Sequence, residues 1–212
     1  MTRVYVVDDH AMMRDGLRVM LEQAGHEVVG DSGDPTRAVA DIVRLEPTVL
    51  LLDLNLGQRS GLELLEQLAP RKLRTRTVVL TMYGQPGQVA QALRAGAAGY
   101  VLKGSPSAEL LAAIDAVAAG RNHLGPEVSA LAATALSAPP PAGVAALSAR
   151  ERQVVTMVVR GSSSSAIAEQ LHLSPKTVES YRSRLMTKLG VADVPALVRL
   201  AIREGLISAD EL

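Results

Sequence analysis

The stretch TVLLLD at residues 48–53 decides the fold. Its consecutive apolar residues are typical of a central strand that is buried on both faces of a parallel sheet. Similar short apolar runs lie before and after it in the chain: RVYVV (3–7), EVVGD (27–31), RTVVLT (76–81) and GYVL (99–102). Segments with helical spacing separate these runs, as in His10–Ala24. This alternation predicts a doubly wound α/β domain of five strand–helix units over residues 1–120.

Composition excludes several classes of protein. The chain has 212 residues, of which 48% are hydrophobic, enough for two compact domains with buried cores. Cysteine is absent, which removes disulfides and thiolate metal sites and agrees with a reducing compartment. No apolar run approaches the roughly 20 residues of a membrane span, and the N-terminus has no signal-peptide pattern. We therefore expect a cytoplasmic protein with no membrane partner.

The pattern changes after residue 120. Residues 126–136 have helical spacing, and three consecutive prolines follow within residues 135–147, where they prevent a helix from continuing. We interpret residues 121–146 as a helix and a proline-rich linker. Residues 147–212 show four successive helical patterns without a strand signal, which predicts a second, all-α domain.

Polar residues stand where the predicted strands end. Asp8 and Asp9 follow the first strand, Asp53 ends the third, Thr81 ends the fourth and Lys103 follows the fifth. Because ligand sites of open parallel sheets collect at the carboxyl ends of the strands, we expect these residues to meet. Three carboxylates would repel one another without a cation, and Mg²⁺ is the natural occupant. One of them can attack phosphorus to form an acyl phosphate, with the lysine and the threonine hydroxyl on phosphoryl oxygens.

Residues 1–120 resemble the receiver domain of two-component response regulators over the whole segment. The resemblance implies that Asp53 accepts a phosphoryl group from a sensor histidine kinase. It also implies that Asp8, Asp9, Asp53 and the backbone carbonyl of Asn55 hold Mg²⁺.

The same resemblance implies roles for three further residues. Thr81 and Tyr100 match the switch pair, in which the hydroxyl moves to the phosphate and the aromatic ring rotates inward, and Lys103 matches the phosphate-binding lysine. Gly57 and Gly104 depart from the family, which usually has proline at the first position and often at the second. Neither departure removes a ligand side chain, so we expect phosphorylation to be retained.

An aspartyl-phosphate enzyme is the alternative for this site, because such phosphatases and ATPases share the Asp nucleophile, the lysine and Mg²⁺. Many of these phosphatases need a second Asp two residues after the nucleophile as general acid. Asn55 stands there and cannot donate a catalytic proton in the same way. The sequence favours a long-lived acyl phosphate used as a signal, and we expect no enzyme activity on a small substrate.

The second domain opens with LSARERQVVTMVVRG (147–161), in which Ser148 and Glu151 form a capping-box pattern. A short second helix is expected over 166–171, and a third begins with Ser174 and Pro175. One stripe of this third helix is apolar: Val178, Leu185 and Leu189, with Tyr181 beside them. The opposite stripe is short, polar or basic: Lys176, Ser180, Ser183 and Thr187. Such a helix suits the major groove of DNA, although a surface helix of a bundle has the same pattern.

Residues 147 to about 206 are similar to the LuxR-type helix-turn-helix of NarL/FixJ response regulators. The resemblance implies that 175–189 is the recognition helix, that duplex DNA is the partner and that the active form is a homodimer. It places the dimer face on residues 193–205, through Val194, Leu197, Val198 and Ala201. This stripe also suits packing within its own domain, and we expect both uses. The residues expected at DNA are Ser163, Ser164, Ser165, Lys176, Thr177, Glu179, Ser180, Arg182, Ser183, Arg184 and Lys188.

Departures in this domain leave an alternative open. Members commonly carry Asn and Lys where this chain has Ser162–Ser165, and serine keeps a hydrogen bond to phosphate but loses the charge. The net charge of the whole chain is zero. The alternative is a receiver-containing adaptor with weak or phosphorylation-independent DNA binding. Glu179 suits either a contact to cytosine N4 or a solvated flank, and activation by domain release or by dimerisation fits the sequence equally.

Overall fold

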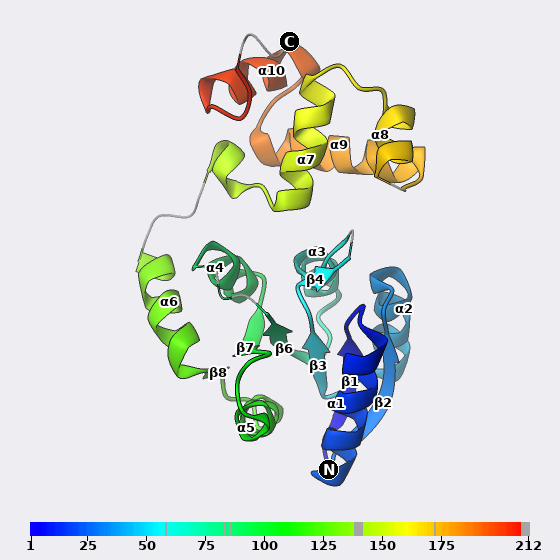
Figure 1. The fold of residues 1–212 in the computed structure, drawn as a ribbon, viewed down its shortest axis with the longest axis vertical. Coiled ribbons are helices and arrows are strands. Elements are labelled where there is room, and N and C mark those ends of the chain that lie inside the picture. The colour runs from blue at the N-terminus through cyan, green and yellow to red at the C-terminus, as the bar shows by residue number, and fades with distance from the viewer. Residues whose placement is uncertain (58, 83, 85, 138–141, 172, 209–212) are drawn as a thin grey trace. The chain divides into compact units, whose positions relative to one another are not determined.

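The computed structural model describes residues 1–57, 59–82, 84, 86–137, 142–171 and 173–208. The chain divides into two compact units, residues 1–138 and 139–212 (Figure 1).

A parallel sheet forms the centre of the first unit. Its strand order is β2-β1-β3-β6-β7-β8. The strands are β1 (Arg3–Val7), β2 (Glu27–Ser32), β3 (Val49–Leu52), β6 (Arg76–Thr81), β7 (Ala97–Leu102) and β8 (His123–Leu124). β3 pairs with β1 on one side and with β6 on the other, and all four of its residues are buried. The prediction that TVLLLD forms a central strand is therefore confirmed.

Helices cover both faces of this sheet, which confirms the doubly wound fold (Figure 1). α1 (Ala11–Gln23) and α5 (Ser107–Ala118) pack with Val49 and Leu51 of β3. α2 (Pro35–Leu45), α3 (Gly61–Leu68) and α4 (Pro86–Arg94) pack with Leu50 and Leu52, which alternate to the opposite face. A small hairpin of β4 (Asn55–Leu56) and β5 (Arg59–Ser60) precedes α3, and a 3₁₀ turn (Ala69–Arg71) follows it.

The region 121–137 folds with the first unit. β8 adds a sixth parallel strand beside β7, which was not predicted because two residues are too short for a periodic signal. The expected helix forms as α6 (Pro126–Ser137) and packs on α4. Val128 and Ala132 of α6 join the core that contains Leu50 and Leu52. The helix is thus part of the receiver-like unit, and the division between the units follows it.

The second unit is helical throughout its described residues. After a 3₁₀ turn (Gly143–Ala146) come α7 (Ala149–Val159), α8 (Ser164–Gln170), α9 (Pro175–Leu189) and α10 (Val194–Arg203). Side-chain caps start each helix: Ser148 with a complete capping box, Ser163, Ser174 and Asp193. The caps satisfy backbone N–H groups that would otherwise lack partners at the helix starts. Among the described residues of the whole chain, no helix is both long and apolar enough to cross a membrane.

Candidate functional site

The acidic residues predicted to meet at the carboxyl edge of the sheet lie together there. β1 and β3 are hydrogen-bonded neighbours, so Asp8 and Asp53 emerge side by side. Their side chains are 2% and 3% exposed. One oxygen from each of Asp8, Asp9 and Asp53, with a ring nitrogen of His10, lie within 4.8 Å of one another. Such a compact set of carboxylate oxygens has the ligand chemistry that Mg²⁺ requires.

The Lys103 ammonium lies between two of these carboxylates. Its Nζ is 2.6 Å from Asp8 Oδ2 and 2.6 Å from Asp53 Oδ2, and the side chain is 4% exposed. Burial acts to lower the pKa of Lys103, but the hydrogen bonds and charges of Asp53 and Asp8 outweigh it and raise that pKa. The lysine therefore remains charged and offsets the repulsion between the two acids. The position between Asp8 and Asp53 is thus one that favours a positive charge.

Thr81 ends β6 beside the acidic cluster. The residue is fully buried, and its hydroxyl has no hydrogen-bond partner among the described residues. An unpaired buried hydroxyl costs about 1–3 kcal/mol. A phosphoryl oxygen that enters this site would supply the missing partner.

Tyr100 lies on β7, the strand next to Thr81. Burial, followed by the negative charge of Asp53, raises the pKa of Tyr100 to about 12. Its side chain is fully buried in the core to which Val128 and Ala132 of α6 contribute. The ring that the resemblance expects to rotate inward is thus already inside in this structure.

The backbone around Asp53 is closely packed. The Asn55 N–H donates to Asp53 Oδ1 at 3.0 Å, which orients the carboxylate. A Cβ on Gly61 would lie 2.1 Å from the Asp53 carbonyl oxygen, so only glycine allows α3 to start here. Gly57 has φ +61°, a conformation that proline cannot adopt, and the turn therefore differs from the proline turn common in receivers.

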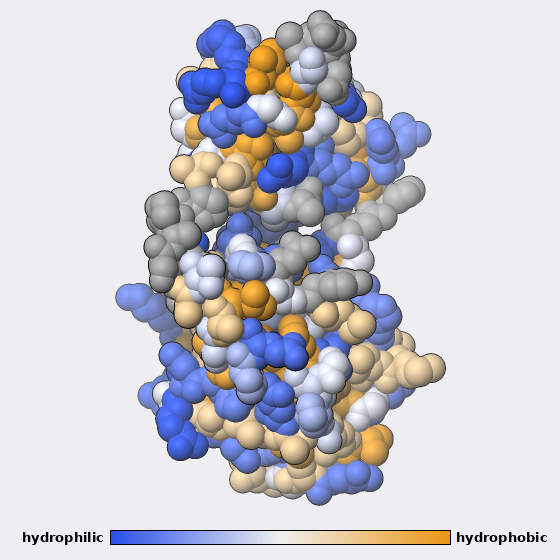
Figure 2. Space-filling view, turned by 60° about the vertical axis from the view of Figure 1, so that its left-hand side comes forward, coloured by the Kyte–Doolittle hydropathy of each residue, from blue (hydrophilic) through white to orange (hydrophobic). Residues whose placement is uncertain are grey.

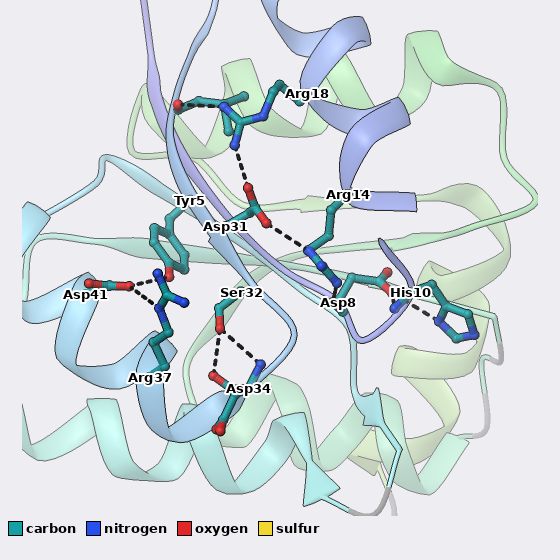
Figure 3. A network of polar contacts seen from close by, with 11 residues as sticks. Tyr5, Asp8, His10, Arg14, Arg18, Asp31, Ser32, Asp34, Arg37 and Asp41 are labelled. Carbon is teal, nitrogen blue, oxygen red and sulfur yellow. Dashed lines mark hydrogen bonds and ion pairs between the residues drawn. The ribbon is translucent and has the colours of Figure 1, made fainter. Parts of the chain in front are cut away.

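Three residues near the acids were not predicted: His10, Arg14 and Asp31. His10 Nδ1 lies 2.8 Å from Asp9 Oδ1 and 3.2 Å from Asp8 Oδ1. Arg14, in α1, donates from Nη1 to the Asp8 carbonyl at 2.7 Å and from Nε to Asp31 Oδ1 at 2.9 Å (Figure 3). The position of Arg14 one turn into α1 placed it near the site, but nothing in the sequence pointed to its partner in β2.

In the second unit, α9 has the two-sided character that was predicted. Val178, Tyr181 and Leu185 are buried in the core of the unit. Six α9 residues expected at DNA are exposed: Lys176, Glu179, Ser180, Ser183, Arg184 and Lys188. The Arg184 guanidinium lies 4.8 Å from the centre of the Tyr181 ring, a cation–π contact at the boundary of the two stripes.

Some residues expected at DNA also make contacts within the unit. Arg182 Nη1 donates to Ser164 Oγ at 2.9 Å, and Lys188 Nζ pairs with Glu151 Oε2 at 2.8 Å.

The hydroxyls of Thr177 and Ser174 lie 2.7 Å apart. Ser163 caps α8, and Ser165 is exposed in its first turn. The Thr177, Ser174 and Ser163 hydroxyls therefore have local structural contacts at the helix starts.

The apolar stripe of α10 packs largely within its own unit. Leu197 and Ala201 are buried, whereas Val194 and Val198 are only partly buried. The space-filling view shows hydrophobic area at the surface of this unit on the side where α10 lies (Figure 2). Part of the stripe is therefore available to a partner.

A parallel sheet with an acidic edge, a lysine and a hydroxyl defines a receiver-type domain, and the helical unit with an exposed polar α9 defines a helix-turn-helix module. Residues 4–115 match the family "Response regulator receiver domain", and residues 145–201 match "Bacterial regulatory proteins, luxR family".

Two curated relatives resemble the chain over nearly its whole length. Response regulator UvrY of Escherichia coli (strain K12) is 35% identical over 100% of this chain and 99% of that protein. The probable transcriptional regulatory protein NarL of Mycobacterium tuberculosis is 36% identical over 97% of this chain and 95% of that protein.

Solved structures agree. A LuxR-family response regulator from Aurantimonas sp. SI85-9A1 has a TM-score of 0.61 at 31% identity, over 65% of this chain and 99% of that one. The structure of two RcsB dimers bound to two parallel DNAs has a TM-score of 0.58 at 28% identity, over 94% and 96%. The chain belongs to the NarL/FixJ family of two-component response regulators, and its function is DNA-binding regulation of transcription.

Proposed function

We propose that Asp53 is the phosphoacceptor of this response regulator and that a sensor histidine kinase is the donor. The observation that carries the proposal is the position of the Lys103 ammonium, which lies 2.6 Å from a carboxylate oxygen of both Asp8 and Asp53 in an almost fully buried site. An Asp53 oxygen would attack phosphorus while the bond to the histidine nitrogen of the kinase breaks, and that nitrogen keeps the electron pair. The product is an acyl phosphate on Asp53 and a free imidazole on the kinase.

Asp8, Asp9, Asp53 and the Asn55 carbonyl would hold the Mg²⁺ of this reaction. The bound ion supplies positive charge at the oxygens of the transferred group. Lys103 would move its ammonium from the free carboxylate to a phosphoryl oxygen, and the Thr81 hydroxyl would donate to another. Both groups already lie at the carboxyl edge of the sheet, Thr81 at the end of β6 and Lys103 beside Asp53.

The signal would leave the site through α6. Leu131 Cδ1 of α6 lies 3.1 Å from the position of a Cβ on Gly84, in the segment after Thr81. The same helix shares the core of Tyr100 through Val128. A shift of Thr81 towards a phosphoryl group would therefore alter the packing of α6, the helix that leads to the second unit.

The output of this signal would be sequence-specific contact between α9 and the major groove. Lys176, Ser180, Ser183 and Arg184 are the exposed residues that would read or position the DNA, together with Glu179 at the flank. The partly buried Val194 and Val198 of α10 would complete a homodimer on paired half-sites. A regulator of this kind would act in the cytoplasm.

Phosphoryl uptake tests the proposed acceptor. Incubation of the full chain with acetyl phosphate and MgCl₂ should add one phosphoryl group, mapped to Asp53 by reductive trapping and mass spectrometry. The Asp53→Asn variant should show at least roughly a hundredfold less labelling, because the amide is a far weaker nucleophile. Uptake by this variant at the wild-type rate would refute the assignment, and a melting curve checks that the variant is folded.

The same experiment separates a signal from an enzyme. A signalling receiver should incorporate one phosphoryl group and release it slowly. An aspartyl-phosphate enzyme should instead release many equivalents of inorganic phosphate in the same time. Asn55 contacts Asp53 through its backbone N–H, and the residue is exposed. Its amide side chain cannot act as the general acid that a phosphatase has there, which favours slow release over turnover.

A further inference from the structure

The peptide groups of Asp8 are fixed from two sides. The Asp8 N–H donates to the Ser32 carbonyl at 3.2 Å, and the Asp8 carbonyl accepts from Arg14 Nη1 at 2.7 Å. The side chain of this residue is one of the buried acids of the proposed Mg²⁺ site, and Asp9 is the next residue. The Arg14 contact therefore lies on the peptide group that joins the two acids.

Arg14 is itself held in place by β2. Its Nε donates to Asp31 Oδ1 at 2.9 Å, with side chains 20% and 29% exposed. Asp31 uses its other oxygen, Oδ2, for Arg18 Nη2 at 2.5 Å, and Arg18 also donates to the Val28 carbonyl at 3.3 Å. Figure 3 shows Asp31 between the two arginines, with only Arg14 reaching the loop of Asp8. The two arginines thus share one carboxylate but differ in whether they contact the acidic site.

Arg14 has two opposite effects on the binding of a cation at the acidic site. The positive charge of Arg14 opposes a cation nearby, whereas its hydrogen bond to the Asp8 carbonyl fixes the loop that carries the acids. Asp31 reduces the first effect by pairing with the guanidinium. The second effect depends on the forked geometry of arginine, because a lysine ammonium keeps the charge but cannot reach both Asp31 and the Asp8 carbonyl in this way.

We propose that Arg14, oriented by Asp31, is a positioning residue for Mg²⁺ binding. It holds the Asp8–Asp9 peptide so that both carboxylates face the ion, and it contacts neither the ion nor the phosphoryl group. The inference rests on the proposed Mg²⁺ site. Groups that orient metal ligands in this way typically change metal affinity by roughly 10-fold or more when they are replaced.

The test compares two charge-conserving variants of the full chain, Arg14→Lys and Arg18→Lys. Each loses part of an ion pair with Asp31, but only Arg14→Lys loses the contact to the Asp8 carbonyl. MgCl₂ titrations, followed by the amide chemical shifts of the loop residues, give the Mg²⁺ dissociation constant. We expect Arg14→Lys to bind Mg²⁺ about 10-fold more weakly than wild type, and Arg18→Lys to stay within about twofold.

Urea unfolding without Mg²⁺ measures the stability of each variant. If Arg14 has only a structural role, the Mg²⁺ affinity of both variants should fall in proportion to their loss of stability. Equal Mg²⁺ affinity of the two variants would overturn the inference. No Mg²⁺ binding by wild type would instead overturn the proposed metal site.

A second measurement covers the case in which Arg14→Lys does not fold. In wild type, MgCl₂ should shift the side-chain Nε–Hε resonance of Arg14 with the same dissociation constant as the loop amides. The resonance of Arg18 should not move, and a shift of both or of neither would refute the positioning role.

Discussion

The acidic edge of the first unit and the exposed stripe of α9 are both built from polar side chains, but they are built in opposite ways. At the acidic edge, residues from three strand ends converge, and Lys103 pairs with Asp8 and Asp53 through side chains that are almost fully buried. On α9, the polar residues come from one helix and most are exposed. In the first arrangement the buried charges are paired with one another within the folded protein. The second is complete only with a partner molecule, so its energetics appear on binding rather than in folding.

The largest effect on stability should come from removing the cation of the acidic edge. Lys103→Met leaves Asp8 and Asp53 buried without their common partner, and we expect the free energy of unfolding to fall by about 3–5 kcal/mol at neutral pH without Mg²⁺. Urea unfolding measures the loss. The matched control is Lys188→Met, which breaks an ion pair of a 36% exposed lysine with Glu151 and should cost at most about 1 kcal/mol.

The pH dependence of this comparison has a definite sign. Because the pKa of Lys103 is raised in the folded protein, its contribution is fully present below the ordinary lysine pKa and is lost as the pH rises through the raised value. Equal losses in the two lysine variants would mean that the acidic edge is no more than a surface ion pair.

DNA affinity should respond to exposed charge on α9 and much less to charge that is already paired. Lys176→Ala should weaken duplex binding severalfold and reduce the slope of log K against log salt by about one, because one phosphate contact is lost. Lys188→Ala removes the same charge from a lysine engaged by Glu151 and should change the slope less. Fluorescence anisotropy at several salt concentrations measures both. A larger slope change for Lys188→Ala would reverse our assignment of the DNA-facing stripe.

The smallest effect separates capping from DNA contact among the serines. Ser163→Ala removes the hydroxyl that accepts from the Ala166 N–H and should lower the free energy of unfolding by about 1 kcal/mol. Ser165→Ala removes an exposed hydroxyl of the same turn and should leave stability within about 0.5 kcal/mol of wild type. Thermal unfolding distinguishes the two variants. A Ser163→Ala variant as stable as wild type would exclude the cap as a source of stability.

The acidic edge and the α9 stripe could both be predicted in outline from the sequence. Topology alone brings strand-end residues to one edge, so the meeting of Asp8, Asp53 and Lys103 was predictable from their order. The buried and exposed stripes of α9 followed from helical spacing. Both inferences depend on periodicity, which a single sequence contains.

Other features depend on contacts between segments and left no periodic signal. Arg14 and Asp31 are 17 residues apart, and Lys188 and Glu151 are 37 apart, so each pairing requires the folded chain. β8 has two residues, too few for a pattern. The need for glycine at position 61 follows from the approach of α3 to the Asp53 carbonyl, which is a property of packing.

If phosphorylation of Asp53 controls the DNA affinity of α9, a phosphate mimic should change that affinity in a single titration. A duplex that contains a binding site is first selected from random sequence with the full chain. This duplex is then titrated with wild type and with Asp53→Asn, each with and without BeF₃⁻ and MgCl₂. We predict that BeF₃⁻ tightens binding by wild type and leaves Asp53→Asn unchanged. Equal tightening in the two proteins, or none in a wild type that takes up BeF₃⁻, would show that the state of Asp53 does not control DNA affinity.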